Sequence, residues 1–225
     1  MSDIGRTALV TGASRGIGLA IANLFRGTGK IRVLAPDRKE LDLSSNTSVD
    51  RYLSQLAWPM DILVNNAGIN PLAGSTEITD FDIESTLQVN LISPMRLIRG
   101  IVPSMIKRNY GRIVNISSIW GTVSKIRRVV YSTSKSGLNG MTRAMAVELA
   151  KYNIMINAVA PGFVNTELTR QNNTKEELKA IAGTIPIGRL AEPHEIAELV
   201  AFLTSEKNTY ITGQTIFADG GYTCL

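Results

Sequence analysis

The stretch TALVTGASRGIG, residues 7–18, joins a short apolar run to a glycine-rich turn and the beginning of a helical pattern. Residues 7–11 are rich in β-forming side chains and lead into glycine, as a buried strand does. After Gly16 apolar residues recur at helical spacing, and Gly27 and Gly29 end that pattern. The stretch therefore predicts a strand, a tight turn and a helix, the unit from which parallel α/β sheets are built.

The turn fits two kinds of site. Residues 12–16 read G-x-S-x-G, the nucleophile elbow of serine hydrolases, with Ser14 as the nucleophile. With Gly18 added, the same stretch reads T-G-x-x-x-G-x-G, typical of a loop that holds a pyrophosphate at a helix N-terminus. A hydrolase needs a general base, and His194, the only histidine, follows Pro193 at the start of a predicted helix. No HGGG-like oxyanion loop is present, so the turn favours a dinucleotide.

The composition is that of one globular domain. The chain has 225 residues, of which 44% are hydrophobic and 19% charged, so we expect a full core and no disorder. The net charge of +5 is scattered, without a nucleic-acid-binding module, and no apolar run is long enough for a membrane span. A single cysteine, Cys224, and a single histidine argue against a disulfide and against zinc. The first residues lack a signal-peptide pattern, so a cytoplasmic protein without nucleic-acid or membrane partners is expected.

Strand and helix patterns alternate along the whole chain. Such alternation predicts right-handed βαβ units and a doubly wound, mostly parallel sheet in a single α/β domain over residues 1–225. The expected strands are 7–11, 31–35, 61–65, 112–117, 154–160 and 215–221, with a very short one at 41–43. The expected helices are 16–27, 46–57, 79–106, 131–151 and 193–204.

Tyr131 and Lys135 strengthen the dinucleotide interpretation. In YSTSK, residues 131–135, they stand at i and i+4 and share one helix face. A nearby ammonium lowers the pKa of a phenol, so Tyr131 could exchange a proton with a substrate hydroxyl or carbonyl near neutral pH.

Together these stretches resemble the short-chain dehydrogenase/reductase family of the TGxxxGxG and YxxxK type, and within it 3-oxoacyl-acyl-carrier-protein reductases. The similarity runs from Thr7 to Gly221. Besides the two stretches above, it rests on NNAG (65–68), Asn90 in VNL, NISS (115–118), NAVAPGFVNTEL (157–168), PIGRL (186–190) and ADGG (218–221). It implies a Rossmann-like sheet of about seven strands.

The resemblance also implies a role for each matching residue. Tyr131 is expected to be the general acid in reduction, Lys135 to lower its pKa and hold the nicotinamide ribose, and Ser118 to hydrogen-bond the substrate oxygen. Asn90 is expected to hold a water in a proton relay to Lys135. The expected cofactor-binding residues, which include Tyr131 and Lys135, are Gly12, Ser14, Arg15, Gly16, Ile17, Gly18, Arg38, Asp42, Asn66, Ala67, Gly68, Pro161, Gly162, Val164 and Thr166.

The segment between the second and third expected strands departs from the family pattern. Only PDRKEL, residues 36–41, stands where the family has a full helix, so that helix is expected to be shortened or absent. An acid at the end of the second strand selects NAD, whereas arginine accommodates the 2′-phosphate of NADP. Pro36 stands at that position, with Arg15 and Arg38 close by in sequence, so NADP(H) is the expected cofactor. Asp37 keeps NAD(H) open.

The expected function is hydride transfer between NADP(H) and a ketone or secondary alcohol, with Tyr131 as general acid/base. A carrier-bound 3-oxoacyl thioester, a sugar, a polyol or another small alcohol are the substrates the resemblance leaves open. A non-catalytic dinucleotide-binding regulator is the alternative of another class, against which the complete set of Asn90, Ser118, Tyr131 and Lys135 argues. Residues 165–189 are the expected substrate lid.

Two further features bear on partners. Leu138, Met141, Met145 and Leu149 form a stripe that faces either the sheet or a second subunit of an expected homo-tetramer, with a dimer next. Lys125, Arg127 and Arg128 precede Tyr131 and could attract an anionic substrate. They could equally form a solvated loop or a subunit contact.

Overall fold

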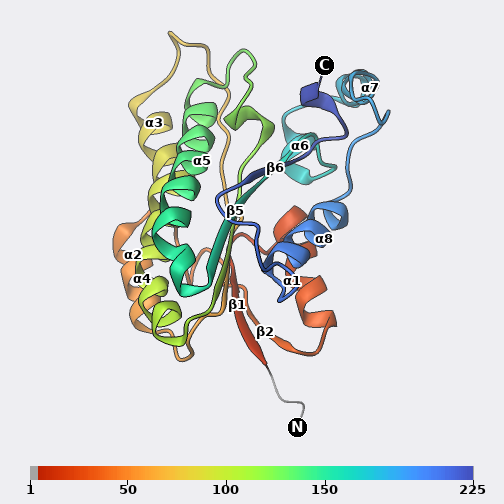
Figure 1. Cartoon of the computed structure of the whole chain (residues 1–225). Helices are drawn as coiled ribbons and strands as arrows, with labels where there is room; N and C mark the ends of the chain where they lie inside the picture. Colours follow the sequence, from red (N-terminus) through yellow and green to blue (C-terminus); the bar gives the residue numbers. More distant parts are fainter. Residues whose placement is uncertain (1–4, 225) are drawn as a thin grey trace.

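A computed structural model describes residues 5–224, which form a parallel sheet between two layers of helices (Figure 1). The six strands are β1 (Arg6–Val10), β2 (Ile31–Leu34), β3 (Ile62–Asn65), β4 (Gly111–Ile116), β5 (Ile154–Pro161) and β6 (Thr215–Ala218). Their order is β2-β1-β3-β4-β5-β6, and every neighbouring pair is parallel. The strand order reverses between β1 and β3, and the carboxyl ends of strands at such a point form a ligand crevice.

The helices cover both faces of the sheet (Figure 1). One layer holds α2 (Asn46–Ser54), α3 (Asp80–Leu87), α4 (Ser93–Arg108) and α5 (Val129–Leu149). The other holds α1 (Gly16–Gly27) and α8 (Pro193–Thr204), while α6 (Glu167–Gln171) and α7 (Lys175–Thr184) lie near the carboxyl ends of the strands. Single turns form η1 (Gln88–Ile92), η2 (Ile119–Gly121), η3 (Ala150–Tyr152) and η4 (Tyr222–Cys224).

Alternate residues of each strand enter opposite cores, as the period of two in a strand requires. Leu9 and Leu63 belong to the core under α4 and α5, whereas Ala8 and Val64 belong to the core under α1 and α8. The α5 stripe joins the first of these cores, where Leu138, Met141 and Leu149 are buried and Met145 packs against them. The stripe therefore faces the sheet, not a second subunit.

The expected helix over 79–106 is divided in the structure. Thr79 and Asp82 form the capping box at its start. After α3, however, residues 88–92 make a π-helical turn before α4 begins. Such turns often mark functional positions, and this one carries Asn90.

The shortened segment between β2 and α2 contains no helix. Residues 35–45 are turns and extended chain, as the missing PDRKEL helix predicts. The strand expected at 41–43 is wrong, which leaves six strands and makes β2 an edge of the sheet. The reason is that the Leu41 amide closes a turn onto the Asp37 carbonyl at 2.9 Å, while Leu41 and Leu43 bury their side chains in the core.

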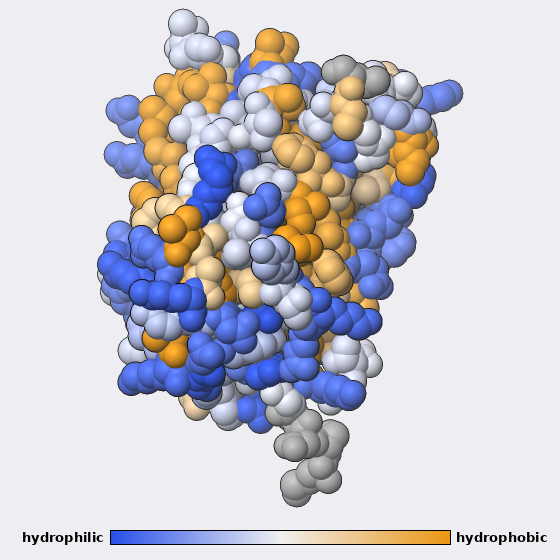
Figure 2. Space-filling model, viewed as in Figure 1, coloured by the Kyte–Doolittle hydropathy of each residue, from blue (hydrophilic) through white to orange (hydrophobic). Residues whose placement is uncertain are grey.

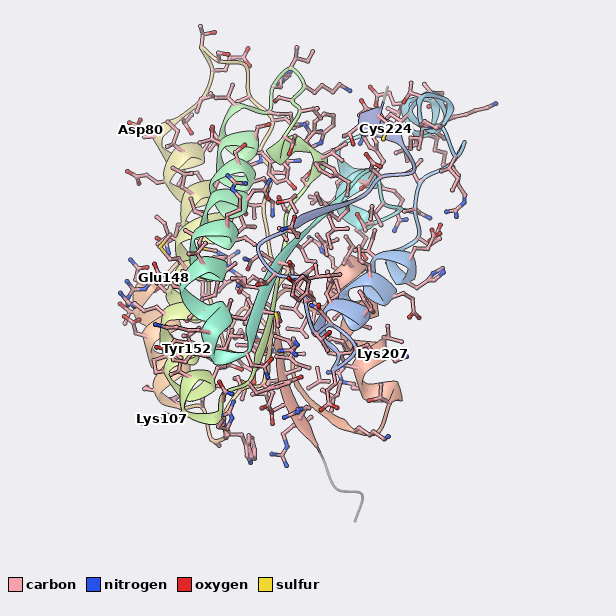
Figure 3. All side chains as sticks on the ribbon, in the orientation of Figure 1. Asp80, Lys107, Glu148, Tyr152, Lys207 and Cys224 are labelled. Carbon is pink, nitrogen blue, oxygen red and sulfur yellow. The ribbon has the colours of Figure 1, made fainter. Side chains whose placement is uncertain are left out.

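The surface differs between the two ends of the strands. Figure 2 shows hydrophilic side chains dominating the end where the strands begin, and apolar ones more frequent toward the carboxyl end. Lys107 and Lys207 lie toward the first end, and Asp80 and the exposed Cys224 at the second (Figure 3). Within residues 5–224 no helix is long and apolar enough to cross a membrane.

Candidate active site

The glycine loop after β1 is shaped to approach an anion. Gly12 and Gly16 have φ of +64° and +56°, in the left-handed region that glycine adopts without strain. Helix α1 starts just after Arg15, with no side-chain cap and no acidic residue in its first turn. Its first N–H groups are therefore free of side-chain caps and carry the positive end of the helix dipole, which fits a pyrophosphate.

Thr11 and Asn66 fix the shape of this loop from the neighbouring strand. The Thr11 hydroxyl accepts from the backbone amides of Asn66 and Ala67 at 3.0 and 3.1 Å. The Asn66 side chain donates to the Thr11 and Gly12 carbonyls at 2.9 and 3.0 Å. A Cβ on Gly18 would lie 2.3 Å from the Asn66 amide nitrogen, which explains glycine there by packing. Asn66 is thus a positioning residue, and Thr11, which the sequence prediction omitted, is another.

Two cavities meet at this loop, of about 330 and 470 Å³. Gly12, Ser14, Ala67 and Gly68 line both, so the two form one elongated groove. The first brings together most of the predicted residues, namely Gly12, Ser14, Arg15, Gly16, Ile17, Asn66, Ala67, Gly68, Ser118, Tyr131, Lys135, Pro161, Gly162, Val164 and Thr166. Arg38 and Asp42 line the second, and Gly18 and Asn90 line neither.

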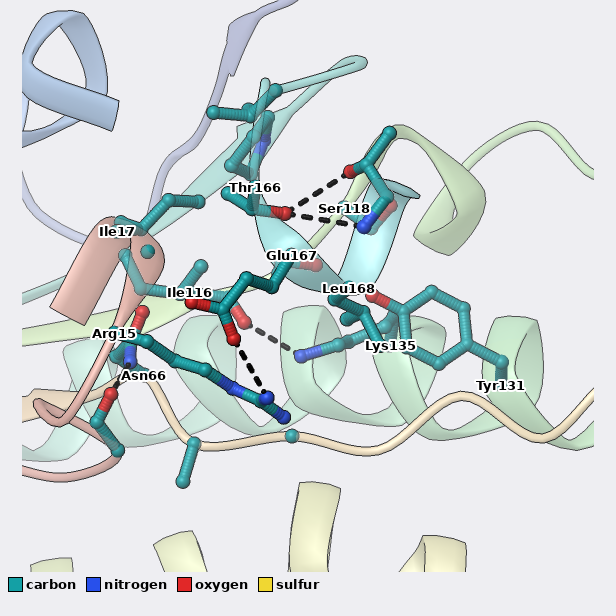
Figure 4. Close-up of a pocket in the computed structure, with 18 of the residues that line it drawn as sticks. Arg15, Ile17, Asn66, Ile116, Ser118, Tyr131, Lys135, Thr166, Glu167 and Leu168 are labelled. Carbon is teal, nitrogen blue, oxygen red and sulfur yellow. Dashed lines mark hydrogen bonds and ion pairs between the residues drawn. The ribbon is translucent and has the colours of Figure 1, made fainter. Parts of the chain in front are cut away.

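Lys135, Tyr131 and Ser118 meet at the end of β4 (Figure 4). Lys135 is buried in α5 and its Nζ donates to the Ile116 carbonyl at 2.7 Å. The same Nζ lies 5.6 Å from the centre of the Tyr131 ring. Ser118 is buried just beyond β4, and its hydroxyl accepts from the Trp120 amide at 3.2 Å. The predicted catalytic residues therefore line one wall of one cavity.

The pKa of Tyr131 differs from the sequence expectation. Burial raises this pKa, while the Ser118 side chain and the charge of Arg128 lower it in part. Burial is the largest of these effects, so the net pKa lies above the ordinary value of a tyrosine, and the lowering of this pKa by Lys135 stays a prediction. Burial also lowers the pKa of Lys135, to about 8. At neutral pH Tyr131 is therefore protonated, the state that a general acid needs.

Asn90 lies behind this wall, within the π-helical turn. Its side chain accepts from the Ile69 amide and donates to the Ile69 carbonyl, both at 2.9 Å, and also donates to the Ser134 hydroxyl at 3.1 Å. A Cβ on Gly68 would lie 3.3 Å from Asn90 Oδ1 and 3.6 Å from Lys135 Nζ. Asn90 therefore joins the segment after β3 to the catalytic helix, and its water relay stays a prediction.

Residues after β5 close over the glycine loop. Arg15 and Glu167, at the start of α6, form an ion pair at 3.0 Å (Figure 4). Glu167, Leu168 and Thr169 line the first cavity, although the sequence prediction named only the surrounding segment. Their position directly after the PGFVNT stretch, on the expected lid, was the signal that could have found them.

The adenosine-facing candidates are more exposed. The side chain of Arg38 is 82% exposed, and its Nε lies 3.6 Å from an Asp42 carboxylate oxygen. That oxygen also accepts from the Ser44 amide and hydroxyl at 2.9 and 2.7 Å, and these bonds lower the pKa of Asp42. The Asp37 carboxylate accepts from the amides of Lys39 and Glu40 within its own turn.

The hydrolase alternative finds no support in this geometry. His194 lies in the first turn of α8 and lines neither of the two cavities that Ser14 lines, so the hydrolase triad is not assembled. Among residues 5–224 no group of three or more His, Cys, Asp or Glu side chains could hold a metal ion.

Comparison with known proteins identifies the family. A family model described as enoyl-(acyl-carrier-protein) reductase matches residues 35–223. The 3-oxoacyl-[acyl-carrier-protein] reductase of Rickettsia typhi is 39% identical over 96% of each chain. The chain belongs to the short-chain dehydrogenase/reductase family. It is an oxidoreductase, so the non-catalytic regulator of the sequence analysis is set aside.

Solved structures of this family superpose closely on the chain. A structure from Beutenbergia cavernae described as a putative NAD(P)-dependent gluconate 5-dehydrogenase, with NADP bound at low occupancy, has a TM-score of 0.93 and 32% identity and covers 98% of both chains. A gluconate 5-dehydrogenase from Burkholderia cenocepacia, in complex with NADP and tartrate, has a TM-score of 0.88 and 28% identity and covers 98% of this chain and 96% of its own. The Rossmann-like fold predicted from the sequence is confirmed.

Proposed function

We propose that this short-chain dehydrogenase/reductase catalyses NADP(H)-linked reduction of a ketone, or the reverse oxidation of a secondary alcohol. The observation that carries the proposal is that Ser118, Tyr131 and Lys135 line the same cavity as the glycine loop. A nicotinamide supplies or accepts the hydride in such an enzyme. The protein must then supply a proton, a hydrogen-bond donor for the carbonyl oxygen and a site for the dinucleotide.

Tyr131 supplies the proton in this proposal. Its phenol stays protonated at neutral pH because burial raises its pKa, and it lines the cavity beside the buried Ser118 hydroxyl. A carbonyl oxygen between these hydroxyls receives a hydrogen bond from each, and Tyr131 transfers its proton as negative charge develops. Lys135 remains anchored on Ile116, where its ammonium stabilises the phenolate left behind.

The preference for NADP(H) is argued from the end of β2. Pro36 stands where an NAD-selecting acid would lie, and the nearby Asp37 carboxylate is committed to its own turn. Arg38 lines the second cavity, and Arg15 lies at the glycine loop, so both guanidinium groups are near the expected adenosine site. Tighter binding of NADH than of NADPH in parallel titrations would contradict this preference.

Two substrate classes have support from relatives. A 3-oxoacyl thioester on an acyl carrier is favoured by the 39% identity with a 3-oxoacyl-[acyl-carrier-protein] reductase. A hydroxy or oxo acid is favoured by the two structures named gluconate 5-dehydrogenase, one of which holds tartrate. Residues 165–189, which include α6 and α7, form the lid over either substrate.

The proposed assembly is a homo-tetramer. Exposed apolar side chains lie on two sides of the molecule, on α3 to α5 and beside β6. The first set is Ile83, Ile92, Met95 and Val147, and the second is Phe202, Tyr210 and Phe217. Two separate apolar areas allow two symmetric interfaces, which a tetramer needs. A monomeric mass by light scattering at micromolar concentration would refute it.

The function is tested by turnover. The purified protein is incubated with NADPH, or separately NADH, and a panel of ketones that includes 3-oxoacyl thioesters and oxo acids, and nicotinamide oxidation is followed by absorbance. We expect turnover of at least one panel member with NADPH. Tight NADPH binding without turnover of any panel member or metabolite extract would refute the reductase assignment.

A further inference from the structure

The three cations before Tyr131 have different surroundings in the structure. Lys125 is exposed. Arg127 is also exposed, donates to the Leu72 carbonyl at 3.2 Å and lies 3.8 Å from Glu77. Arg128, in contrast, is only 9% exposed. Arg127 thus holds a neighbouring loop, and only Arg128 is enclosed beside the catalytic helix.

Arg128 has no partner within residues 5–224. No described carboxylate lies within salt-bridge distance, and its guanidinium makes no hydrogen bond to a described group. Arg112, which is 3% exposed, shows how this protein otherwise buries an arginine, since it donates to the backbone carbonyls of Gly111, Asn153, Ser205 and Asn208. A mostly buried charge without a partner is unfavourable, and an anion bound beside it offsets that cost.

Arg128 lies close to the catalytic tyrosine. Arg128 is the N-cap of α5, and Tyr131 is the third helical residue, so both lie on the same side of the helix start. The charge of Arg128 lowers the pKa of Tyr131 in part, so the two groups are near enough to interact. None of the Arg128 nitrogens is among the fully enclosed unpaired atoms of residues 5–224, so the end of this mostly buried side chain stays open to a small molecule.

We propose that Arg128 binds a carboxylate of the substrate, and that the enzyme selects carbonyl compounds with a free carboxylate a few bonds from the reacting carbon. The proposal rests on the carbonyl reduction proposed above and narrows its substrate class. Arg128 and Tyr131 are three residues apart, which is less than one helical turn of about 5.4 Å. The carboxylate bound by Arg128 therefore lies near the reacting carbonyl of the substrate, not at the far end of a carrier arm. One guanidinium matches one planar carboxylate in a bidentate pair.

The test compares 3-oxobutanoate with its neutral ethyl ester, using NADPH. We expect the wild type to favour the acid in kcat/KM by about tenfold or more. In Arg128→Gln the acid-to-ester ratio of kcat/KM falls about 100-fold, mainly through KM for the acid, as loss of a buried charge pair predicts. Arg127→Gln, which removes the exposed neighbouring charge, leaves the ratio unchanged.

A second measurement does not depend on the folding of a variant. Butanoate should inhibit the wild type competitively with the ketone, and the isosteric butanamide should inhibit at least about tenfold more weakly. Equal inhibition by both, or a wild type that favours the ester, would overturn the proposal, as would equal losses on acid and ester in Arg128→Gln. Stronger inhibition by a short alkyl phosphate than by butanoate would overturn the assignment of a carboxylate and indicate a phosphate as the group that Arg128 binds. Absence of turnover of both substrates and of the whole panel would instead refute the reductase function.

Discussion

The two halves of the groove are built differently. On the catalytic side, Lys135 and Ser118 are buried, and the ammonium bonds to a backbone carbonyl at the end of β4. On the side of residues 35–44 the chain forms turns and extended segments without a helix, and the Arg38 side chain is mostly exposed. Enclosed groups have their pKa values shifted by burial and their geometry fixed, whereas exposed groups are screened by water. Substitutions on the catalytic side should therefore have large effects, whereas substitutions on the side of residues 35–44, where no helix forms, should have smaller ones.

The largest expected effect is on the catalytic side. Tyr131→Phe removes the acidic hydroxyl and keeps the ring, so kcat should fall at least about 100-fold, within the range of general acid–base effects. The Kd for NADPH should change little, because the glycine loop and α1 are untouched. Both are measured on one preparation, by steady-state kinetics and fluorescence titration. Turnover near the wild-type level would overturn the role of Tyr131.

The second prediction concerns pH and the stability of the buried ammonium. Burial lowers the pKa of Lys135 from 10.5 to about 8, so between these values the unfolded chain binds more protons than the folded one. The contribution of Lys135 to the free energy of unfolding therefore rises with pH over that interval. Below pH 8 the buried ammonium lowers this free energy by at most on the order of 3 kcal/mol. Lys135→Met removes this dependence.

This prediction is checked by urea unfolding of both proteins at several pH values. The free energy of unfolding of the wild type, minus that of Lys135→Met, should increase as the pH rises from 8 toward 10.5. The lost bond to Ile116 shifts the whole difference but not its slope. A difference independent of pH would show that the ammonium is hydrated in the folded protein.

The sequence predicts those features of the groove that depend on residues close together in the chain. The glycine turn, the Tyr131–Lys135 pair and the missing helix are local patterns, and the structure places them as predicted. The π-helical turn at Asn90 and the bond from Lys135 to Ile116 need segments far apart in the chain to meet. Hydrophobic periodicity does not record such contacts. The pKa of Tyr131 is raised by burial, and the degree of burial also depends on such distant contacts. The YxxxK motif by itself therefore does not predict the direction of this pKa shift.

A third prediction concerns the loop where the two halves meet. Arg15→Ala should weaken NADPH binding about tenfold, the loss of one charge-assisted contact, and NADH binding less. Arg26→Ala removes an equal charge from the other end of α1 and serves as the control. Equal weakening of NADPH and NADH by Arg15→Ala would mean that Arg15 contacts the pyrophosphate and not the 2′-phosphate.

The smallest expected effect concerns the exposed ion pair between Arg15 and Glu167, where solvent should keep the contribution of each side chain small. Glu167 pairs with Arg15 at 3.0 Å, and both side chains are about half exposed, so the pair contributes at most about 1 kcal/mol. If Arg15 binds the cofactor, Glu167 competes for it, and Glu167→Gln should tighten NADPH binding two- to threefold, roughly, with the gain fading in high salt. The same substitution in the Arg15→Ala background should have no effect, because the competitor has then lost its partner. A gain that persists without Arg15, or weaker NADPH binding in Glu167→Gln, would instead make Glu167 part of the lid that closes over the groove.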